Sequence, residues 1–262
     1  MVEHKLSIIG HRGNRAAAPE NTIEAFHQCL VDQRVDGIEL DTWDNDFGLI
    51  PVIHDQEVNI TTNGNGSVSR MNQSQLAVLR CRFGGKFTDE GIPRLADVFA
   101  LIESANRTNF LVNVEMKANP EDGDLENGTK DGFASRVGTL IRSFPKLNVV
   151  VSSFDHRRVV NLKKQFPEIN IALLQEGITV LDTLRSYTGE YGFSWWNLKF
   201  SSVSPKVVKA ARAAGAKVAA WVANDQQEWE RLMKCGVDAI ITDKPLQLAD
   251  WVSETRAGAL SK

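Results

Sequence analysis

The chain has 262 residues, of which 42% are hydrophobic and 24% are charged, and its formal net charge is −3. This length allows one large domain or two small ones. The small negative charge excludes a sequence-wide basic field of the kind that draws a protein onto nucleic acid, so we expect no nucleic-acid partner. An anionic ligand would have to meet local positive charge instead.

The amino-terminal segment and the cysteines exclude further classes. The apolar run from Leu6 to Ile9 is too short for a signal-peptide core or a membrane span, so we expect a cytoplasmic protein without stable membrane insertion. Cys29, Cys81 and Cys235 lie far apart and form no C-x-x-C pair. This spacing argues against a disulfide framework and a structural zinc site, and we expect reduced thiols.

Eight short runs of β-branched and apolar residues recur along the chain and predict eight strands. Their ranges are 6–10, 36–40, 110–116, 148–153, 169–175, 195–200, 217–222 and 237–242. Most of these runs are apolar at successive positions, as expected of strands that are buried on both faces.

Segments with helical periodicity separate these strands. The segment 19–33 carries Ile23 and Phe26 on one face, and the segments 204–215 and 225–236 each end on a glycine. Buried strands that alternate with helices imply a parallel sheet with right-handed crossovers. Eight such units in about 250 residues favour an α/β fold, a closed (β/α)₈ TIM barrel, over an open doubly wound sheet.

Two irregular segments interrupt this alternation. Residues 56–92 contain no clear barrel strand and include the polar stretch ITTNGNGSVS, which predicts a small insertion after the second strand, within a single domain of residues 1–262. Residues 118–130, after the third strand, are acidic and contain glycine. On a barrel both segments would lie at the C-terminal mouth, where catalytic loops collect.

Glu39 and Asp41 interrupt the apolar run of the second strand. Residues two apart on a strand share a face, so these carboxylates point together and away from Ile38 and Leu40. A third acid, Glu115, stands at the end of the third strand. Like charges in such a place resist burial unless a cation neutralises them or one holds a proton. Three convergent oxygens suit a hard cation, Mg²⁺ or Ca²⁺, while salt bridges with Arg and Lys are an equally open interpretation.

Two histidines and two basic residues also lie at the ends of apolar runs. His11 closes the first strand and His54 follows a later run. Together the two imidazoles would form an acid–base couple near neutral pH, although each alone is compatible with a structural role. Arg12 can hold a phosphate with two hydrogen bonds, and Lys117 adds a compact positive charge. This set predicts phosphate-ester chemistry, and it does not exclude pairing of both basic residues with the acids.

Four further positions give weaker signals. Trp221 and Phe154 end two barrel strands, and Trp221 is a candidate wall of the site. Asn21, with Glu24 three residues later, resembles a helix N-cap and its reciprocal partner, so we expect a structural role. Asp243 precedes a Lys-Pro pair and is most simply the cap of the last helix.

The motifs around these residues resemble the glycerophosphodiester phosphodiesterase family nearly end to end. The family's H-R-G and P-E-N-T opening is matched by GHRGNRAAAPENTIEAF, its E-x-D and H-D elements by GIELDTW and VIHD, and its T-T-x-G-x-G stretch by ITTNGNGSV. Further matches in order and spacing are IPRLADVF, VNVEMK, VVVSSFD, AAWVAND and GVDAIITDKP. The chain departs from the family pattern at Asn45, Phe47 and Ile60, none of which is a candidate ligand or base.

The resemblance implies a TIM barrel that hydrolyses glycerophosphodiesters to sn-glycerol 3-phosphate and an alcohol, in the degradation of glycerophospholipids. One divalent cation, Mg²⁺ or Ca²⁺, would be held by Glu39, Asp41 and Glu115. Catalysis would use His11 and His54 as acid and base and would pass through a cyclic phosphate. Phosphate contacts would come from Arg12 and Lys117.

Three alternatives stay open at the level of sequence. They are a metal-independent glycosidase with paired carboxyls, a non-catalytic phosphate binder, and a lysophospholipase D or sphingomyelinase D specificity on the same site, which the missing hydrophobic anchor disfavours. The sequence also leaves open the leaving alcohol, the choice between Mg²⁺ and Ca²⁺, which histidine is the acid in the first step, and the oligomeric state.

Overall fold

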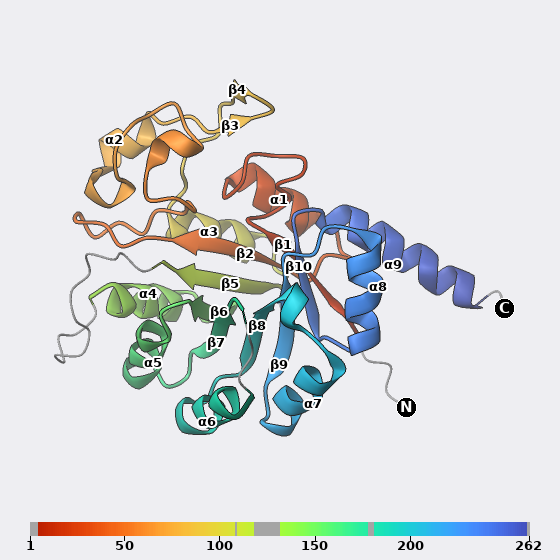
Figure 1. Cartoon of the computed structure of the whole chain (residues 1–262). Helices are drawn as coiled ribbons and strands as arrows, with labels where there is room; N and C mark the ends of the chain where they lie inside the picture. The colour runs from red at the N-terminus through yellow and green to blue at the C-terminus, as the bar shows by residue number, and fades with distance from the viewer. Residues whose placement is uncertain (1–4, 108, 118–131, 178–180, 261–262) are drawn as a thin grey trace.

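The computed structural model describes residues 5–107, 109–117, 132–177 and 181–260, with the side chains of 256–260 left aside. Eight parallel strands close into a barrel in the order β1-β10-β9-β8-β7-β6-β5-β2 (Figure 1). The predicted TIM barrel is therefore confirmed. The barrel strands are β1 (Ser7–His11), β2 (Gly37–Thr42), β5 (Leu111–Met116), β6 (Asn148–Ser153), β7 (Asn170–Gln175), β8 (Trp195–Lys199), β9 (Lys217–Trp221) and β10 (Ala239–Thr242).

Helices cover the outside of the barrel. They are α1 (Ile23–Val31), α3 (Leu95–Ser104), α4 (Gly132–Ser143), α5 (His156–Gln165), α6 (Leu181–Tyr191), α7 (Pro205–Ala213), α8 (Gln226–Cys235) and α9 (Pro245–Leu260), with a short η4 (Phe200–Ser202) before α7. Local sequence sets their ends: Ser204 caps α7 ahead of Pro205, and Gly236 ends α8 in the left-handed conformation that glycine adopts without strain. Their apolar faces pack against outward-facing strand residues such as Ile38 and Leu40.

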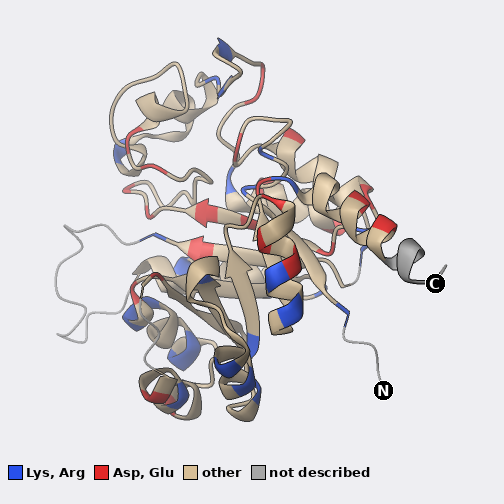
Figure 2. Ribbon diagram, turned by 45° about the vertical axis from the view of Figure 1, so that its right-hand side comes forward, with Lys and Arg blue, Asp and Glu red and all other residues tan. Residues whose placement is uncertain are grey.

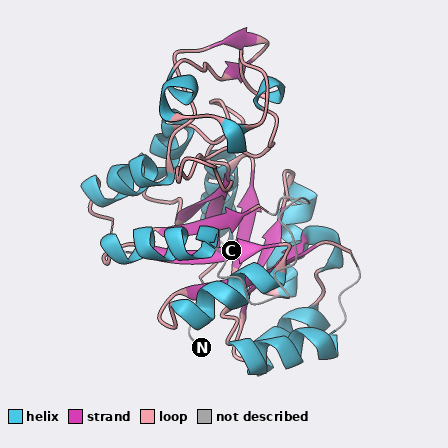
Figure 3. Ribbon diagram, turned by 90° about the vertical axis from the view of Figure 1, so that its left-hand side faces the viewer, coloured by secondary structure: helices cyan, strands magenta, loops and turns pink. Residues whose placement is uncertain are grey.

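The predicted insertion after the second strand forms a small body beside the barrel, uppermost in Figures 1 and 3. It contains η1 (Val58–Ile60), η2 (Val68–Arg70), α2 (Gln73–Ala77), and the antiparallel pair β3 (Arg82–Phe83) and β4 (Lys86–Phe87). The body has its own apolar cluster, which joins Val58, Val68, Leu76 and Leu79 to Trp43 and Ile53 from the segment after β2. The other irregular segment, residues 118–130, lies outside the described residues.

The barrel interior changes character along its axis. Below the mouth it is filled by a compact apolar layer, made of Ile9, Leu111, Val150, Ala172, Ala219, Ala239 and Ile241, of which Ile241 also lines the cavity at the mouth. Towards the carboxyl ends, inward-facing positions become polar and charged. Parallel strands bring all these ends to one mouth, so residues that are far apart in sequence meet there.

Candidate active site

Three buried carboxylates meet at the mouth. Glu39 and Asp41 point inward from β2, and Glu115 points inward from the neighbouring β5, where it lies in register with Asp41. Figure 2 shows acidic segments near the arrowheads of these two strands. One oxygen from each of the three side chains lies within 4.8 Å of the others, and each residue is at most 7% exposed. We call Glu39, Asp41 and Glu115 the acidic triad.

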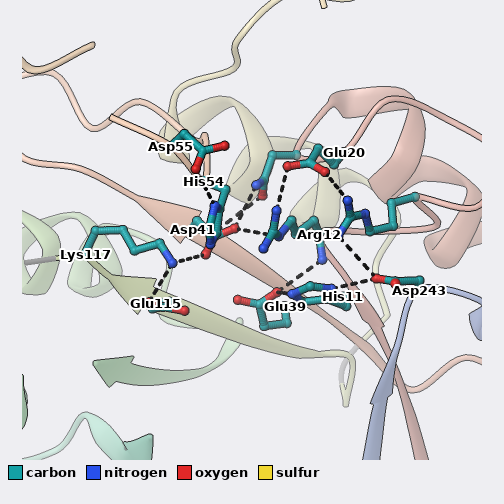
Figure 4. A network of polar contacts seen from close by, with 12 residues as sticks. His11, Arg12, Glu20, Glu39, Asp41, His54, Asp55, Glu115, Lys117 and Asp243 are labelled. Carbon is teal, nitrogen blue, oxygen red and sulfur yellow. Dashed lines mark hydrogen bonds and ion pairs between the residues drawn. The ribbon is translucent and has the colours of Figure 1, made fainter. Parts of the chain in front are cut away.

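Two basic side chains lie against the acidic triad. Lys117 Nζ is 2.9 Å from Asp41 Oδ1 and 2.8 Å from Glu115 Oε1, and Arg12 Nε is 3.3 Å from Asp41 Oδ2 (Figure 4). The backbone N–H of Arg12 also donates to Glu39 Oε2, at 3.1 Å. The pairing of Arg12 and Lys117 with the acids, which the sequence left open as an alternative, is thus observed. Three carboxylates against two basic groups still leave an excess of negative charge.

This excess determines how the acids titrate in the ion-free protein. Burial, reinforced by Asp41 and Glu115, raises the pKa of Glu39 well above its usual range. Burial and Asp41 likewise raise the pKa of Glu115 to about 7. Burial acts in the same direction on Asp41, but Lys117 and Arg12 outweigh it and hold the pKa of Asp41 below its usual range. Asp41 is therefore the stable anion of the triad, whereas nearby positive charge is too small to offset burial and like-charge repulsion at the two glutamates.

The two histidines face the same space, and each has a carboxylate partner. His11 Nδ1 donates to Asp243 Oδ1 at 2.7 Å, and His54 Nδ1 donates to Asp55 Oδ1 at 3.0 Å. The Nε2 atom of His11 lies 3.9 Å from Glu39 Oε2. A ring that donates through Nδ1 keeps Nε2 for a substrate. Burial lowers the pKa of both His11 and His54, which favours the neutral imidazole that can accept a proton.

Two predicted capping residues have other roles in the structure. The N-cap of α1 is Thr22, whose side chain accepts from Ala25 N, so the prediction for Asn21 was wrong. Asn21 instead has a φ of 58° and donates through Nδ2 to Asp41 Oδ2 at 2.9 Å. This left-handed backbone is one that Asn tolerates better than most residues, and it turns the amide towards the acidic triad.

The predicted capping role of Asp243 was also wrong. Besides His11, its carboxylate accepts a hydrogen bond of 2.7 Å from Asn224 Nδ2. Arg15 Nη1 lies 3.6 Å from Oδ1, the oxygen that also accepts from His11. Burial would raise the pKa of Asp243, but the hydrogen bond and charge of His11, together with Arg15 and Asn224, outweigh burial and lower it. Asp243 is therefore an ionised partner that fixes the His11 ring.

A cavity of about 130 Å³ joins all eight residues that the sequence singled out. Its charged side is formed by the acidic triad, both histidines, Arg12 and Lys117, and its apolar side by Phe154, Leu174, Trp221, Val222 and Ile241. Phe154 and Trp221 meet edge to face, with ring centroids 5.6 Å apart. A larger hollow of about 450 Å³, between the loop after β2, α3 and α4, is lined by none of the eight. The chemistry therefore belongs to the smaller cavity.

The donor set of the acidic triad fits a divalent cation. All three donors are carboxylate oxygens, which Mg²⁺ and Ca²⁺ prefer, and they converge in a buried place. Their negative charge exceeds what Arg12 and Lys117 supply, and the raised pKa values of Glu39 and Glu115 express that excess. A bound cation would remove it.

The departures from the family pattern lie away from these groups. Asn45 is buried, and its Nδ2 donates to the carbonyl oxygens of Val68 and Met71, so it ties the loop after β2 to the insertion. Phe47 and Ile60 are each 57% exposed.

In the parts of the chain that the structure describes, no helix is long and apolar enough to cross a membrane. Cys29, Cys81 and Cys235 are free thiols, as expected.

A closed parallel barrel with buried titratable groups at its C-terminal mouth belongs to the TIM-barrel class of enzymes. The model of the glycerophosphoryl diester phosphodiesterase family matches residues 11–247. The chain therefore belongs to this family and is a phosphoric diester hydrolase. This membership overturns the glycosidase alternative.

Individual relatives agree with the family match. The chain is 34% identical over 254 residues to a glycerophosphodiester phosphodiesterase of Caldanaerobacter subterraneus subsp. tengcongensis, with 95% of this chain and 98% of that protein covered. It is 30% identical over 243 residues to a glycerophosphodiester phosphodiesterase of Bacillus altitudinis, with coverages of 91% and 94%.

Solved structures share the fold. A phosphodiesterase of Oleispira antarctica, determined in complex with the product sn-glycerol-3-phosphate, has a TM-score of 0.80 at 22% identity, over 94% of this chain and 96% of that one. A glycerophosphodiester phosphodiesterase of Agrobacterium tumefaciens has a TM-score of 0.77 at 24% identity, over 94% and 100%.

Proposed function

We propose that this enzyme hydrolyses glycerophosphodiesters to sn-glycerol 3-phosphate and an alcohol, with one divalent cation, Mg²⁺ or Ca²⁺, at the acidic triad. The observation that carries the proposal is that the triad shares a single cavity with His11 and His54. The product named for the Oleispira antarctica structure is consistent with this substrate class.

Binding of the phosphodiester would use the charged side of the cavity. A divalent cation held by the triad supplies Lewis-acid stabilisation of the phosphoryl oxygens. Arg12 and Lys117 are placed to hold the remaining negative charge, and Arg12 is itself fixed because its Nη1 donates to Glu20 Oε1 at 2.7 Å. Trp221 and Phe154 would wall the opposite side and exclude water from it.

Proton transfer would use the two histidines in turn. One imidazole takes the proton of the neighbouring glycerol hydroxyl, whose oxygen attacks phosphorus, while the other imidazolium gives a proton to the leaving alkoxide. The product of this step is a cyclic phosphate and the free alcohol. Water then opens the ring with the two proton transfers reversed. This route selects the glycerol group and tolerates variation in the alcohol.

The direct test is release of glycerol 3-phosphate from glycerophosphocholine and glycerophosphoethanolamine. We expect turnover that chelator abolishes and added Mg²⁺ or Ca²⁺ restores. Glu115→Gln should lose the restoration, whereas Glu103→Gln, at an exposed position on α3, should keep it. Binding of glycerol 3-phosphate without turnover would instead identify a non-catalytic binder, and full turnover in excess chelator would remove the cation from the proposal.

The cytoplasmic location, the role in glycerophospholipid degradation and the absence of a nucleic-acid partner stay predictions from the sequence. The site residues His11, His54, Glu39, Asp41, Glu115, Arg12, Lys117 and Trp221 keep their proposed roles.

A further inference from the structure

Two neutral polar side chains in the walls of the catalytic cavity each have a buried atom without a hydrogen-bond partner in the described part of the chain. Asn113 is 3% exposed, and its Oδ1 is a buried acceptor; Trp221 Nε1 is a buried donor. Neither atom has a hydrogen-bond partner within the described part of the chain. Both residues line the cavity that contains the acidic triad.

The strand order fixes where these two atoms lie. Asn113 is on β5, two residues before Glu115 and in register with Glu39, so its side chain faces inward beside the acidic triad. Trp221 is on β9, and three strands separate β9 from β5 in either direction around the barrel. The unpaired acceptor and the unpaired donor therefore belong to opposite walls of one small space.

A buried polar group without a partner destabilises the protein unless a ligand or water satisfies it. An unpaired acceptor facing an unpaired donor matches a ligand that carries hydroxyl groups, since a hydroxyl both donates and accepts. The cavity of about 130 Å³ has the volume of about four water molecules, at about 30 Å³ each. Such a space suits a short polyol rather than an acyl chain.

We propose that Asn113 is a specificity-determining residue whose Oδ1 accepts a hydrogen bond from a hydroxyl of the substrate's glycerol group, with Trp221 Nε1 donating to the other end of the same diol. This inference rests on the proposed function and adds to it the means by which the glycerol is recognised. Charged groups bind the phosphate, whereas the neutral side chains of Asn113 and Trp221 recognise the hydroxyl groups of the glycerol.

Matched ligands separate recognition of the hydroxyls from recognition of the phosphate. Glycerol 3-phosphate and propyl phosphate share a three-carbon chain and a phosphate and differ in the two hydroxyls. Calorimetric titration of the full chain with each ligand, in saturating Ca²⁺, measures the preference. We expect the wild type to favour glycerol 3-phosphate, and Asn113→Ala to weaken its binding by about 10- to 100-fold while propyl phosphate changes by less than about 3-fold.

Three further variants serve as controls and as independent tests. Asn113→Leu removes the acceptor but fills the space, so it replaces the alanine variant if that chain does not fold. Trp221→Phe keeps an aromatic side chain but removes the donor together with part of the indole, and should reduce the preference by about 3- to 10-fold. Ser152→Ala removes another buried, unpaired oxygen, from a residue of β6 that does not line the cavity, and should keep the full preference.

The outcomes distinguish the inference from the function on which it rests. An Asn113 variant that keeps the wild-type preference overturns the inference. So does a variant that loses affinity for Ca²⁺ when titrated without either phosphate, because Asn113 would then be a cation ligand. A wild type that neither prefers glycerol 3-phosphate nor hydrolyses glycerophosphodiesters overturns the proposed function itself.

Discussion

The two ends of the barrel interior are built from the same strands and have opposite properties. On β1, Ile9 belongs to the closed apolar layer and His11 to the cavity; on β5, the same holds for Leu111 and Glu115. Every second residue of a strand faces inward, so a residue of the apolar layer lies only two to four positions before a residue of the cavity on the same strand. Substitutions in the apolar layer should therefore change stability, whereas substitutions in the cavity at the mouth should change activity.

The largest effect is expected at the histidines. His11→Ala and His54→Ala should each lower kcat for glycerophosphocholine by about 10²–10⁴-fold, because each removes a proton-transfer group. Stability should change by less than about 1 kcal/mol, since neither residue belongs to the apolar layer. Steady-state kinetics and thermal unfolding check this, with His27→Ala at an exposed position of α1 as the control. A variant with full activity would remove that histidine from the mechanism.

The opposite end of the same strand should give the converse result. Ile9→Ala leaves a cavity in the apolar layer and should lower the free energy of unfolding by about 2–5 kcal/mol. The kcat of the folded protein should change little, since the mouth is untouched. Urea denaturation measures the loss, with Val31→Ala as the control because Val31 is 59% exposed. A large loss of kcat in the folded Ile9→Ala protein would show that the apolar layer also affects activity, and would contradict the prediction.

A third prediction concerns pH and the cation. The raised pKa of Glu115, about 7 against 4.5 for the ordinary group, means that the ion-free folded chain holds this proton more tightly than the unfolded chain. This contribution to stability is complete below pH 4.5 and is lost as the pH rises through about 7. A cation competes with the proton, so the stabilisation it provides should grow over the same interval.

Thermal unfolding with and without Ca²⁺ measures this growth. At about 100 times the dissociation constant, Ca²⁺ should stabilise the fold by about 2.7 kcal/mol at about pH 8, and by much less at about pH 5. Glu115→Gln, which cannot ionise, should flatten this dependence. Equal stabilisation at both pH values would contradict the account of the triad.

The smallest effect is expected at Asp243, which acts through His11. Asp243→Asn should lower kcat by about 10- to 100-fold, with little change in stability, because the His11 ring loses its orienting carboxylate. The hydrogen bond and charge of Asp243 raise the pKa of His11, so the variant should move the corresponding limb of the pH–rate profile to lower pH. A uniform loss of rate with an unmoved profile would indicate a merely structural role.

The sequence was sufficient to predict the barrel and the gathering of the main groups. β-branched runs such as 148–153 were recognisable, and that strand has the predicted bounds. Because parallel strands end at one mouth, groups at strand ends were expected to meet there, as Glu39, Asp41 and Glu115 do.

What the sequence did not predict depends on contacts between distant residues. His11 and Asp243 are 232 residues apart, and a carboxylate before Lys-Pro is equally compatible with a helix cap. Asn21 and Thr22 are both good capping residues, and only the left-handed φ of Asn21 directs its amide to Asp41. Asn113 had no signal beyond its position two residues before Glu115, which places both side chains on one face of the strand.

The account depends on the acidic triad being a site for a divalent cation. Calorimetric titration of the chelator-treated protein with Ca²⁺ and Mg²⁺ tests this most directly. We predict saturable binding of one ion per chain, lost in Glu39→Gln and Glu115→Gln and retained in Glu103→Gln. Binding that survives both substitutions in the triad, or an active wild type that binds neither ion, would contradict the account.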